Sequence, residues 1–344
     1  MKNGEERIST GKTREGEDEF DASLRPHTFE EFVGQESLKE NLRIFVAAAK
    51  KRGEALDHVL LCGPPGLGKT TLARILAGEI GVSIVATSGP VLEKKGDLAG
   101  NLTNMQEREI LFIDEVHRLN RVVEESLYPA MEDFIFDITI GEGPAARSVQ
   151  LPLKKFTLVG ATTRAGMITS PMRGRFGYVG RLDYYTPGDL EIIALRSAKI
   201  LGVECDKRAA LELGKRARGT PRIVNRLLRR CRDVADVKHS GKINPDVVRQ
   251  TLAMLGVDDE GLDEMDRRIL KSMIENYRGG PVGLTTIAVV VGEEPDTIEE
   301  VYEPFLIQSG FLKRTPRGRM VTEKAYKYFN IVPGKRNNGQ QELL

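Results

Sequence analysis

The segment 63–70, GPPGLGKT, constrains the fold of this chain more than any other part of the sequence. It matches the phosphate-binding P-loop pattern, follows the apolar run HVLLC and precedes helix-compatible sequence. Glycines in such a loop let backbone N–H groups and a helix N-terminus surround phosphate groups. We predict that Lys69 contacts the β and γ phosphates and that the Thr70 hydroxyl ligates magnesium. The alternative is a glycine-rich turn without a ligand.

Short apolar runs alternate with amphipathic helical stretches between about residue 24 and residue 185. Nearly continuous apolar runs of this kind form buried parallel strands with helices on both faces of the sheet. We therefore predict an α/β fold with a parallel sheet for this part of the chain. The runs occupy 58–62, 83–87, 109–114 and 156–162.

Two of these runs end in residues suited to phosphate chemistry. The third ends in Asp114 and is followed by Glu115, which we predict as the metal ligand and the base that polarises the attacking water. The fourth ends in Thr162 and is followed by Thr163, and one of these hydroxyls would lie beside the γ-phosphate if the strands are adjacent. His117, in DEVH, also suggests a DExH-box helicase, but no arginine-rich motif of that class follows. A positioning or packing role is therefore favoured for this histidine.

Three arginines are candidates for stabilising charge at the γ-phosphate. In SPMRGRF, which is predicted to be non-helical, Arg173 or Arg175 could reach a neighbouring subunit's nucleotide and make hydrolysis depend on assembly. The alternative for both is a surface arginine. In RGTPR, Thr220 and Pro221 fit the N-cap and first residue of a helix. Arg222 at that helix start could reach a phosphate, so that hydrolysis changes the angle between two domains.

Beyond residue 185 the strand pattern stops and helical periodicity begins. Ile192, Leu227 and Cys231 are among the apolar residues spaced for buried helix faces. Further on, three helical stretches and two short apolar runs around a basic turn outline a winged helix. Both ends of the chain are polar and charged, a composition typical of disorder. The predicted organisation is a disordered leader (1–20), the α/β domain (21–185), an all-helical domain (186–257), a winged-helix domain (258–333) and a disordered tail (334–344).

Charge balance, cysteine spacing and the length of apolar runs narrow the possible classes of function. Lys and Arg number 51 against 50 Asp and Glu, so a nucleic-acid site would have to be a local basic patch. Cys62, Cys205 and Cys231 form no C-x-x-C pair, which predicts neither a zinc site nor a disulfide framework and favours a reducing, cytoplasmic setting. No apolar run approaches the roughly 20 residues that cross a bilayer.

A local basic patch occurs near the end of the predicted winged helix. Lys313, Arg314, Arg317 and Arg319 gather in KRTPRGR, on a turn between two predicted strands. Such a cluster can neutralise phosphates without distinguishing bases; the alternative is a solvated charged face. We predict contact with duplex DNA, chiefly through Arg314 and Arg319. Alanine at both is expected to abolish DNA-stimulated ATP hydrolysis and to spare the basal rate.

Taken together, these motifs resemble those of the AAA+ ATPases. GPPGLGKT, LFIDEVHR, GATTR, SPMRGRF and RGTPR occur in the order and approximate spacing of that family, and LRP, GQE, TSGP, YPAMEDF, GGPVGL and RTPRGR resemble its RuvB members over about residues 21–333. The resemblance implies that Thr162 or Thr163 is sensor 1, Arg175 the trans arginine finger and Arg222 sensor 2. It also implies nucleotide contacts through Leu24, Arg25, Gly66, Gly68, Thr71, Glu132, Asp133, Phe134 and Tyr185.

The same resemblance implies a DNA motor that uses ATP and magnesium. RuvB-type proteins form homohexameric rings on duplex DNA and drive branch migration of Holliday junctions in recombination and repair. The segment 135–153 is implied to be a β-hairpin that docks RuvA, with RuvC in the resolving complex. Its alternating apolar residues also suggest a hairpin, with a plain sheet extension as the alternative. Clamp loading and protein unfolding share the core motifs, but the basic wing and the hairpin favour a motor.

Overall fold

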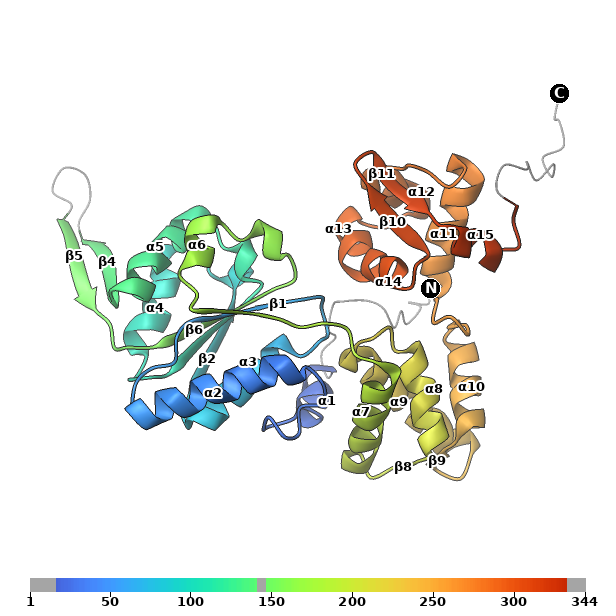
Figure 1. Cartoon of the computed structure of the whole chain (residues 1–344), viewed down its shortest axis with the longest axis horizontal. Coiled ribbons are helices and arrows are strands. Elements are labelled where there is room, and N and C mark those ends of the chain that lie inside the picture. The colour runs from blue at the N-terminus through green and yellow to red at the C-terminus, as the bar shows by residue number, and fades with distance from the viewer. Residues whose placement is uncertain (1–16, 141–146, 333–344) are drawn as a thin grey trace. The chain divides into compact units, whose positions relative to one another are not determined.

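The computed structural model describes residues 17–140 and 147–332 of the 344-residue chain (Figure 1). The described part divides into two compact units, one formed by Ala22–Tyr185 and the other by residues 17–21 and 186–332. The predicted tail and most of the predicted leader lie outside the described residues. Within the described part, no helix is both long and apolar enough to span a membrane.

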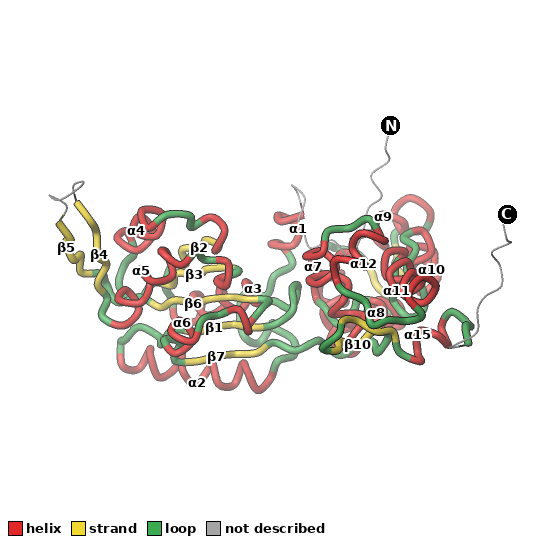
Figure 2. Tube along the Cα trace, turned by 90° about the horizontal axis from the view of Figure 1, so that it is seen from above, coloured by secondary structure: helices red, strands yellow, loops and turns green. Residues whose placement is uncertain are grey.

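The unit Ala22–Tyr185 is built on a five-stranded parallel sheet of order β2-β3-β6-β1-β7, visible as a row of yellow strands in Figure 2. Four strands coincide with the predicted apolar runs, which confirms the α/β fold. The fifth, β7, was not predicted because it pairs with β1 alone and is only partly buried. The strands are β1 (Val59–Cys62), β2 (Ile84–Ser88), β3 (Ile110–Asp114), β6 (Thr157–Thr162) and β7 (Tyr178–Arg181).

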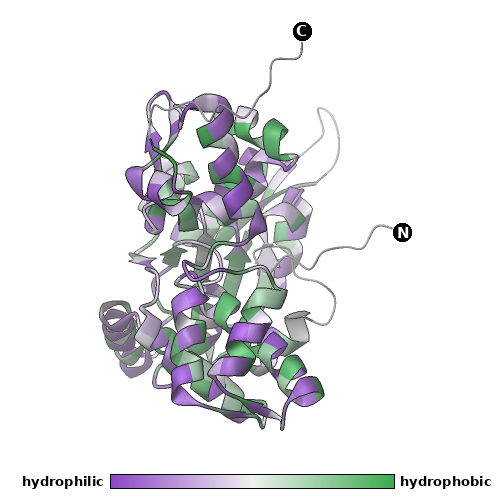
Figure 3. Cartoon of the chain, turned by 90° about the vertical axis from the view of Figure 1, so that its right-hand side faces the viewer, coloured by the Kyte–Doolittle hydropathy of each residue, from purple (hydrophilic) through white to green (hydrophobic). Residues whose placement is uncertain are grey.

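Amphipathic helices cover this sheet. Leu60 and Leu111 of the strands and Leu127 of a covering helix share one buried cluster. Polar residues occupy the outer faces of such amphipathic helices. Figure 3 shows both purple and green segments along the helical ribbons of the chain. The helices are α2 (Glu36–Arg52), α3 (Lys69–Ile80), α4 (Lys95–Asn104), α5 (Arg121–Glu132) and α6 (Ser170–Gly174).

Strands β4 (Ile135–Ile140) and β5 (Arg147–Pro152) form the predicted hairpin. They pair with each other in a separate two-stranded sheet, so they do not extend the central one. Phe136 is fully buried at the base, whereas the residues 147–150 are exposed. Residues 141–146 lie outside the described part. Figure 1 shows the hairpin projecting from the α/β domain.

The segment 186–257 forms a mainly helical lid. Leu227 and Cys231 are buried as predicted, but Ile192 is 54% exposed because the buried face of its helix passes through Leu190, Ile193 and Ala194. A short parallel strand pair also corrects the prediction of a purely helical domain. The elements are α7 (Pro187–Ile200), β8 (Glu204–Cys205), α8 (Lys207–Arg216), α9 (Pro221–Lys238), β9 (Lys242–Ile243) and α10 (Pro245–Met254).

Helix α1 (Glu17–Ser23) begins inside the predicted disordered leader. The Arg229 guanidinium of α9 lies 4.7 Å from the centroid of the Phe20 ring. A cation on an aromatic face is an attractive contact that sequence composition does not reveal. The predicted leader is therefore wrong for residues 17–20, which fold beside the lid.

The segment 258–333 has the predicted winged-helix outline over its described residues. Its core gathers Leu270, Tyr302 and Phe311, and two antiparallel strands form the wing. A π-helical turn over Ile298–Tyr302 interrupts the last of the three predicted helices. The elements are α11 (Glu264–Tyr277), α12 (Leu284–Val291), α13 (Pro295–Thr297), α14 (Glu303–Gln308), β10 (Leu312–Thr315), β11 (Gly318–Val321) and α15 (Glu323–Tyr328).

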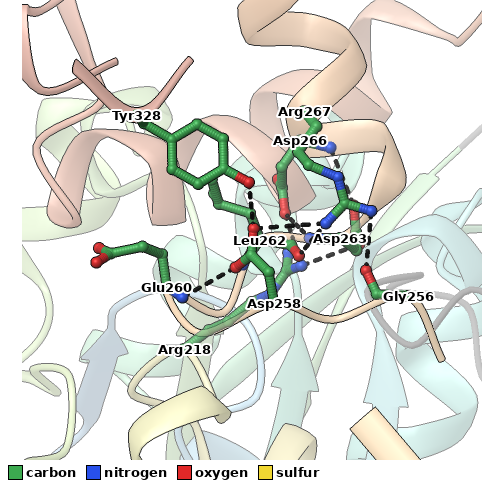
Figure 4. Close-up of polar contacts among 9 residues, drawn as sticks. All are labelled: Arg218, Gly256, Asp258, Glu260, Leu262, Asp263, Asp266, Arg267 and Tyr328. Carbon is green, nitrogen blue, oxygen red and sulfur yellow. Dashed lines mark hydrogen bonds and ion pairs between the residues drawn. The ribbon is translucent and has the colours of Figure 1, made fainter. Parts of the chain in front are cut away.

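A buried ion-pair cluster joins the lid to the winged-helix domain (Figure 4). Arg218, just before α9, places Nη2 2.6 Å from Asp266 Oδ2 and 2.9 Å from Asp263 Oδ2. Its guanidinium also lies 4.7 Å from the centroid of the Phe305 ring. Burial raises the pKa of Asp266 to about 7, although the charge of Arg218 opposes that rise.

We expect Asp266 to make the stability of this unit depend on pH. Its folded pKa of about 7 exceeds the ordinary value of 3.8, so protonation favours the folded state. The contribution is complete below pH 4 and is lost as the pH rises through 7, by at most about 1.4 kcal/mol per pH unit. Urea unfolding between pH 5 and pH 8 measures it, with Asp266→Asn as the variant that loses this slope. Equal slopes in both proteins would contradict the prediction.

Candidate nucleotide site and basic wing

The P-loop connects β1 to α3 at the carboxyl edge of the sheet. Gly63 has φ 150°, and a Cβ there would lie 2.6 Å from the Leu182 carbonyl oxygen, so the turn requires glycine. Gly66 and Gly68 also have positive φ. Lys69 is the first residue of α3, and its Nζ donates to the Gly63 carbonyl at 2.7 Å. The loop therefore places an ammonium group and a helix N-terminus together, as phosphate binding requires.

Thr70 and Asp114 form an oxygen pair suited to magnesium. The Thr70 hydroxyl, in the first turn of α3, donates to Asp114 Oδ2 at 3.2 Å. Hydroxyl and carboxylate oxygens are hard ligands, and Mg²⁺ in nucleotide sites commonly takes one or two protein oxygens and completes its shell with phosphate and water. The residues present therefore fit a magnesium ion bound together with a nucleotide. Thr71 follows in the same helical turn and is half-buried.

Glu115 is held in a strained position beside this pair. Its φ of 47° is uncommon for a residue with a side chain, and such strain gathers at functional sites. Its carbonyl oxygen would be 2.5 Å from a Cβ at residue 89, so glycine there makes the approach possible. Burial raises the pKa of Glu115, but hydrogen bonds from His117 and Thr163 outweigh burial and hold that pKa below its ordinary value. Glu115 is therefore an ionised carboxylate at neutral pH.

The structure distinguishes the two threonines at the end of β6. Thr163 donates to Glu115 Oε2 through its hydroxyl at 3.0 Å and through its backbone N–H at 3.3 Å. Thr162 is fully buried, and its Oγ1 lies 2.9 Å from His117 Nδ1. The same imidazole nitrogen is 3.1 Å from Glu115 Oε2. His117 therefore positions the carboxylate, and only Thr163 is partly exposed near the site.

The residues assigned to an adenine and ribose pocket separate into two groups. Tyr185 is buried and its hydroxyl donates to the Leu67 carbonyl at 3.1 Å, so it packs on the P-loop. Leu24 is buried as well, and Arg25 is half-buried. The other group, Glu132, Asp133 and Phe134, lies elsewhere in the domain.

Phe134 shows where that second group lies. Its ring is 6.4 Å from the His58 ring and 5.9 Å from the Phe156 ring, between centroids. His58 immediately precedes β1 and Phe156 immediately precedes β6, so both mark the amino edge of the sheet. The P-loop lies at the other end of β1, about 13 Å of extended chain away. Glu132, Asp133 and Phe134 therefore do not lie beside the P-loop of their own subunit, and their assignment to a nucleotide pocket stays a prediction.

Arg175 belongs to the same amino edge. SPMRGRF, predicted to be non-helical, contains the short helix α6, and Arg175 is its C-cap. Thr169 caps the start of that helix by accepting the Met172 N–H, a local signal that outweighs the glycine near its end. Arg175 Nη2 donates to Glu132 Oε2 at 3.1 Å. This arginine thus lies away from its own P-loop, as a residue acting on a neighbour must.

Arg222 lies in the first turn of α9 and is half-exposed. Pro221 is the first helical residue and Thr220 the N-cap residue, as predicted, but the Thr220 hydroxyl donates to the Ala217 carbonyl and does not cap the helix. Arg222 and the P-loop belong to different compact units. Its role as a phosphate sensor stays a prediction.

The basic wing contains paired and unpaired cations. Arg314 and Arg319 face each other across β10 and β11, and both contact Glu303, which is 1% exposed, through Nε at 2.6 and 3.1 Å. Arg319 is only 17% exposed. Lys313 and Arg317 are exposed, and neither has an ion-pair partner among the described residues.

This pairing changes the expected effect of alanine at both Arg314 and Arg319. The double substitution would leave Glu303 buried without the cations that compensate its charge, which is strongly destabilising. Loss of DNA stimulation in that variant would therefore not separate DNA contact from damage to the domain. The exposed cations Lys313 and Arg317 offer the cleaner test.

Sheet order, P-loop, acidic strand end and lid together define an AAA+ P-loop ATPase. Family models of RuvB match consecutive parts of the chain: the Holliday junction DNA helicase RuvB P-loop domain at 24–182, the RuvB AAA lid domain at 185–258 and the RuvB C-terminal winged helix domain at 259–330. The chain belongs to the RuvB family.

Solved structures agree with this assignment. The chain is 54% identical to the RuvB Holliday junction branch migration motor of Thermotoga maritima, with a TM-score of 0.83 over 90% of this chain and 99% of that one. An arginine-to-alanine variant of the same Thermotoga maritima protein is also 54% identical, with a TM-score of 0.82 over 90% of this chain and 98% of the other.

Proposed function

We infer that this chain is an ATP-driven motor that moves duplex DNA and so migrates Holliday junctions. The observation that carries the inference is the Glu115 carboxylate, held by Thr163 beside the Thr70 and Asp114 oxygens, in a chain of the RuvB family. A winged-helix domain with exposed cations supplies a surface for DNA phosphates. We propose that the motor works as a homohexamer with RuvA, which docks on the hairpin of β4 and β5, and with RuvC in the resolving complex.

The site's own residues account for hydrolysis of the γ-phosphate. Lys69 would bind phosphate oxygens, and Thr70 and Asp114 would hold a magnesium ion, which would supply neutralisation of phosphate charge. Glu115, ionised and oriented by Thr163, accepts a hydrogen bond from the attacking water and polarises it. Thr163 serves as sensor 1 because it contacts Glu115 and is partly exposed.

We propose that Arg175 completes the site of a neighbouring subunit. It lies with Glu132, Asp133 and Phe134 at the edge opposite its own P-loop, so this edge would face the neighbour's nucleotide. An arginine supplied in trans neutralises transition-state charge and makes hydrolysis depend on the ring. Arg222 would act on the nucleotide of its own subunit as sensor 2, while Leu24, Arg25 and Tyr185 form that pocket's wall.

We expect the double substitution Lys313→Ala with Arg317→Ala to weaken duplex binding for every sequence. Log affinity falls with log salt, and each lost phosphate contact reduces the magnitude of that negative slope by about 0.9. Fluorescence anisotropy of a labelled duplex across a salt series measures the slope, with Lys271→Ala on α11 as the control for loss of an exposed cation. An unchanged slope would remove the wing cations from the DNA interface.

A synthetic four-way junction tests the function as a whole. Incubation with ATP should split the junction into two duplexes, RuvA should increase the rate, and no splitting should occur without ATP. A loader that uses hydrolysis only for release would bind the junction and hydrolyse ATP without splitting it. That outcome, with RuvA present, would overturn the inference.

A further inference from the structure

The Tyr128 ring of α5 lies against the guanidinium of Arg175. The guanidinium carbon is 4.1 Å from the ring centroid, and at such distances an aromatic face attracts a cation. Arg175 Nη2 donates to Glu132 Oε2 at 3.1 Å, and Nη1 donates to the Pro171 carbonyl at 2.8 Å. The arginine is therefore held by a ring, a carboxylate and a carbonyl, with 20% of its side chain exposed.

Tyr128 is itself fixed by its hydroxyl. That O–H donates to Glu124 Oε1 at 2.6 Å, and the hydroxyl of Thr169 donates to the same oxygen. Thr169 is also the N-cap residue of α6, the helix that ends beside Arg175. Glu124 thus fixes the hydroxyl of Tyr128 on α5 and the hydroxyl of Thr169 at the start of α6. It therefore links the ring to the helix that ends at Arg175.

Such a contact has a kinetic consequence for an arginine that acts at a distance. An unrestrained arginine side chain samples many rotamers, so only some of its conformations present the guanidinium in one direction. Stacking on a fixed ring restricts those rotamers before any phosphate arrives. A group that is ordered beforehand contributes more to the transition state than one that must be ordered during the reaction.

We propose that Tyr128 is a positioning residue for Arg175, and that its ring presents the guanidinium to the γ-phosphate of a nucleotide bound by a second copy of this chain. The inference rests on the proposed trans role of Arg175 and adds the residue that orients it. Because the cluster lies at the amino edge and the P-loop at the carboxyl edge, the phosphate that Tyr128 serves belongs to a neighbour.

Mixed rings of the full chain test this proposal. Tyr128→Leu removes the ring and should lower the turnover number about tenfold to a hundredfold, whereas Lys69→Ala disables its own P-loop and keeps an intact Arg175 and Tyr128. In an equal mixture, about one interface in four joins a working P-loop to an intact arginine and ring, by random head-to-tail pairing. ATP hydrolysis of the mixture should therefore exceed that of either variant alone several-fold.

Two further variants separate a positioning role from a structural one. Tyr128→Phe keeps the ring without the hydroxyl and should recover most of the lost turnover. Tyr178→Leu removes another half-buried tyrosine of the same domain, whose ring packs against Phe45, and its mixture with Lys69→Ala should show no several-fold gain. A Tyr128→Leu mixture without gain would mean that Tyr128 acts within its own subunit and would overturn the proposal.

A mixture of Arg175→Ala with Lys69→Ala tests the trans role of Arg175 separately from the positioning role of Tyr128. A gain in that mixture, together with unchanged turnover in Tyr128→Leu, would overturn the role of Tyr128 and leave the trans arginine standing. If ATP hydrolysis rises neither when Tyr128→Leu nor when Arg175→Ala is mixed with Lys69→Ala, the trans role of Arg175 itself is overturned. Gains in both mixtures are the expected result.

Discussion

Replacing Glu115 with glutamine should lower ATP hydrolysis by about a hundredfold or more and leave ATP binding in place. The substitution keeps the size of the side chain and removes the negative charge that we propose polarises the attacking water, a contribution typically worth 10²–10⁴ in rate. The hydrogen bonds from Thr163 can still be accepted by the amide oxygen, so the local backbone should be preserved. Steady-state hydrolysis and binding of a fluorescent ATP analogue measure the two effects separately.

Glu54→Gln is the matched control for this substitution. Glu54 is an exposed carboxylate that pairs with Arg52 at the surface, so its neutralisation should change neither measurement. Hydrolysis by Glu115→Gln within tenfold of the unsubstituted protein would show that another group polarises the water. Loss of ATP binding would instead indicate that the charge at residue 115 is needed to form the site.

Replacing Arg218 with alanine should destabilise the unit that contains the lid and the winged helix by about 3–5 kcal/mol. The side chain of Arg218 is 5% exposed and that of Asp266 is fully buried, so above pH 7, where Asp266 is ionised in the presence of Arg218, removing the cation leaves an uncompensated acidic group in a region that water does not reach. Packing against the Phe305 ring is lost as well. Urea unfolding followed by circular dichroism measures the difference.

Arg249→Ala provides the comparison, because Arg249 and its partner Asp246 are both more than 70% exposed. Such surface pairs contribute about 0–1 kcal/mol. The double substitution Arg218→Met with Asp266→Leu should recover most of the lost stability, since well-packed apolar side chains often replace a buried ion pair without loss. A cost below about 1 kcal/mol for Arg218→Ala would show that the cluster does not hold lid and winged helix together.

Features encoded by a few consecutive residues were predicted from the sequence. The P-loop and the acidic end of β3 are short patterns in which strand, turn and helix signals agree, and four of the five central strands are continuous apolar runs. The wing hairpin was predicted from two short apolar runs around a basic turn, and the hairpin of β4 and β5 was implied by the family resemblance and suggested by alternating apolar residues. Edge strand β7 lacks such a run because it pairs with β1 alone and is only partly buried, so fewer of its residues need to be apolar.

Other features depend on residues that are distant in the sequence. The order of strands places Phe134 beside His58 and Phe156, and this moved Glu132, Asp133 and Phe134 away from the pocket of their own subunit. Glu303 pairs with Arg314 and Arg319, so charge counting alone did not reveal that two of the wing cations are held by a buried carboxylate. Burial at the end of β6 distinguished Thr163 from Thr162.

The sequence by itself determined that this chain has an ATP site on a parallel α/β sheet, because the backbone geometry of a P-loop and the polarity of buried strands are local properties. Only the tertiary structure decided which side chains share that site. Sheet register and helix packing set the distances between residues such as Glu115 and Thr163, and they also placed Arg175 at the edge opposite its own P-loop.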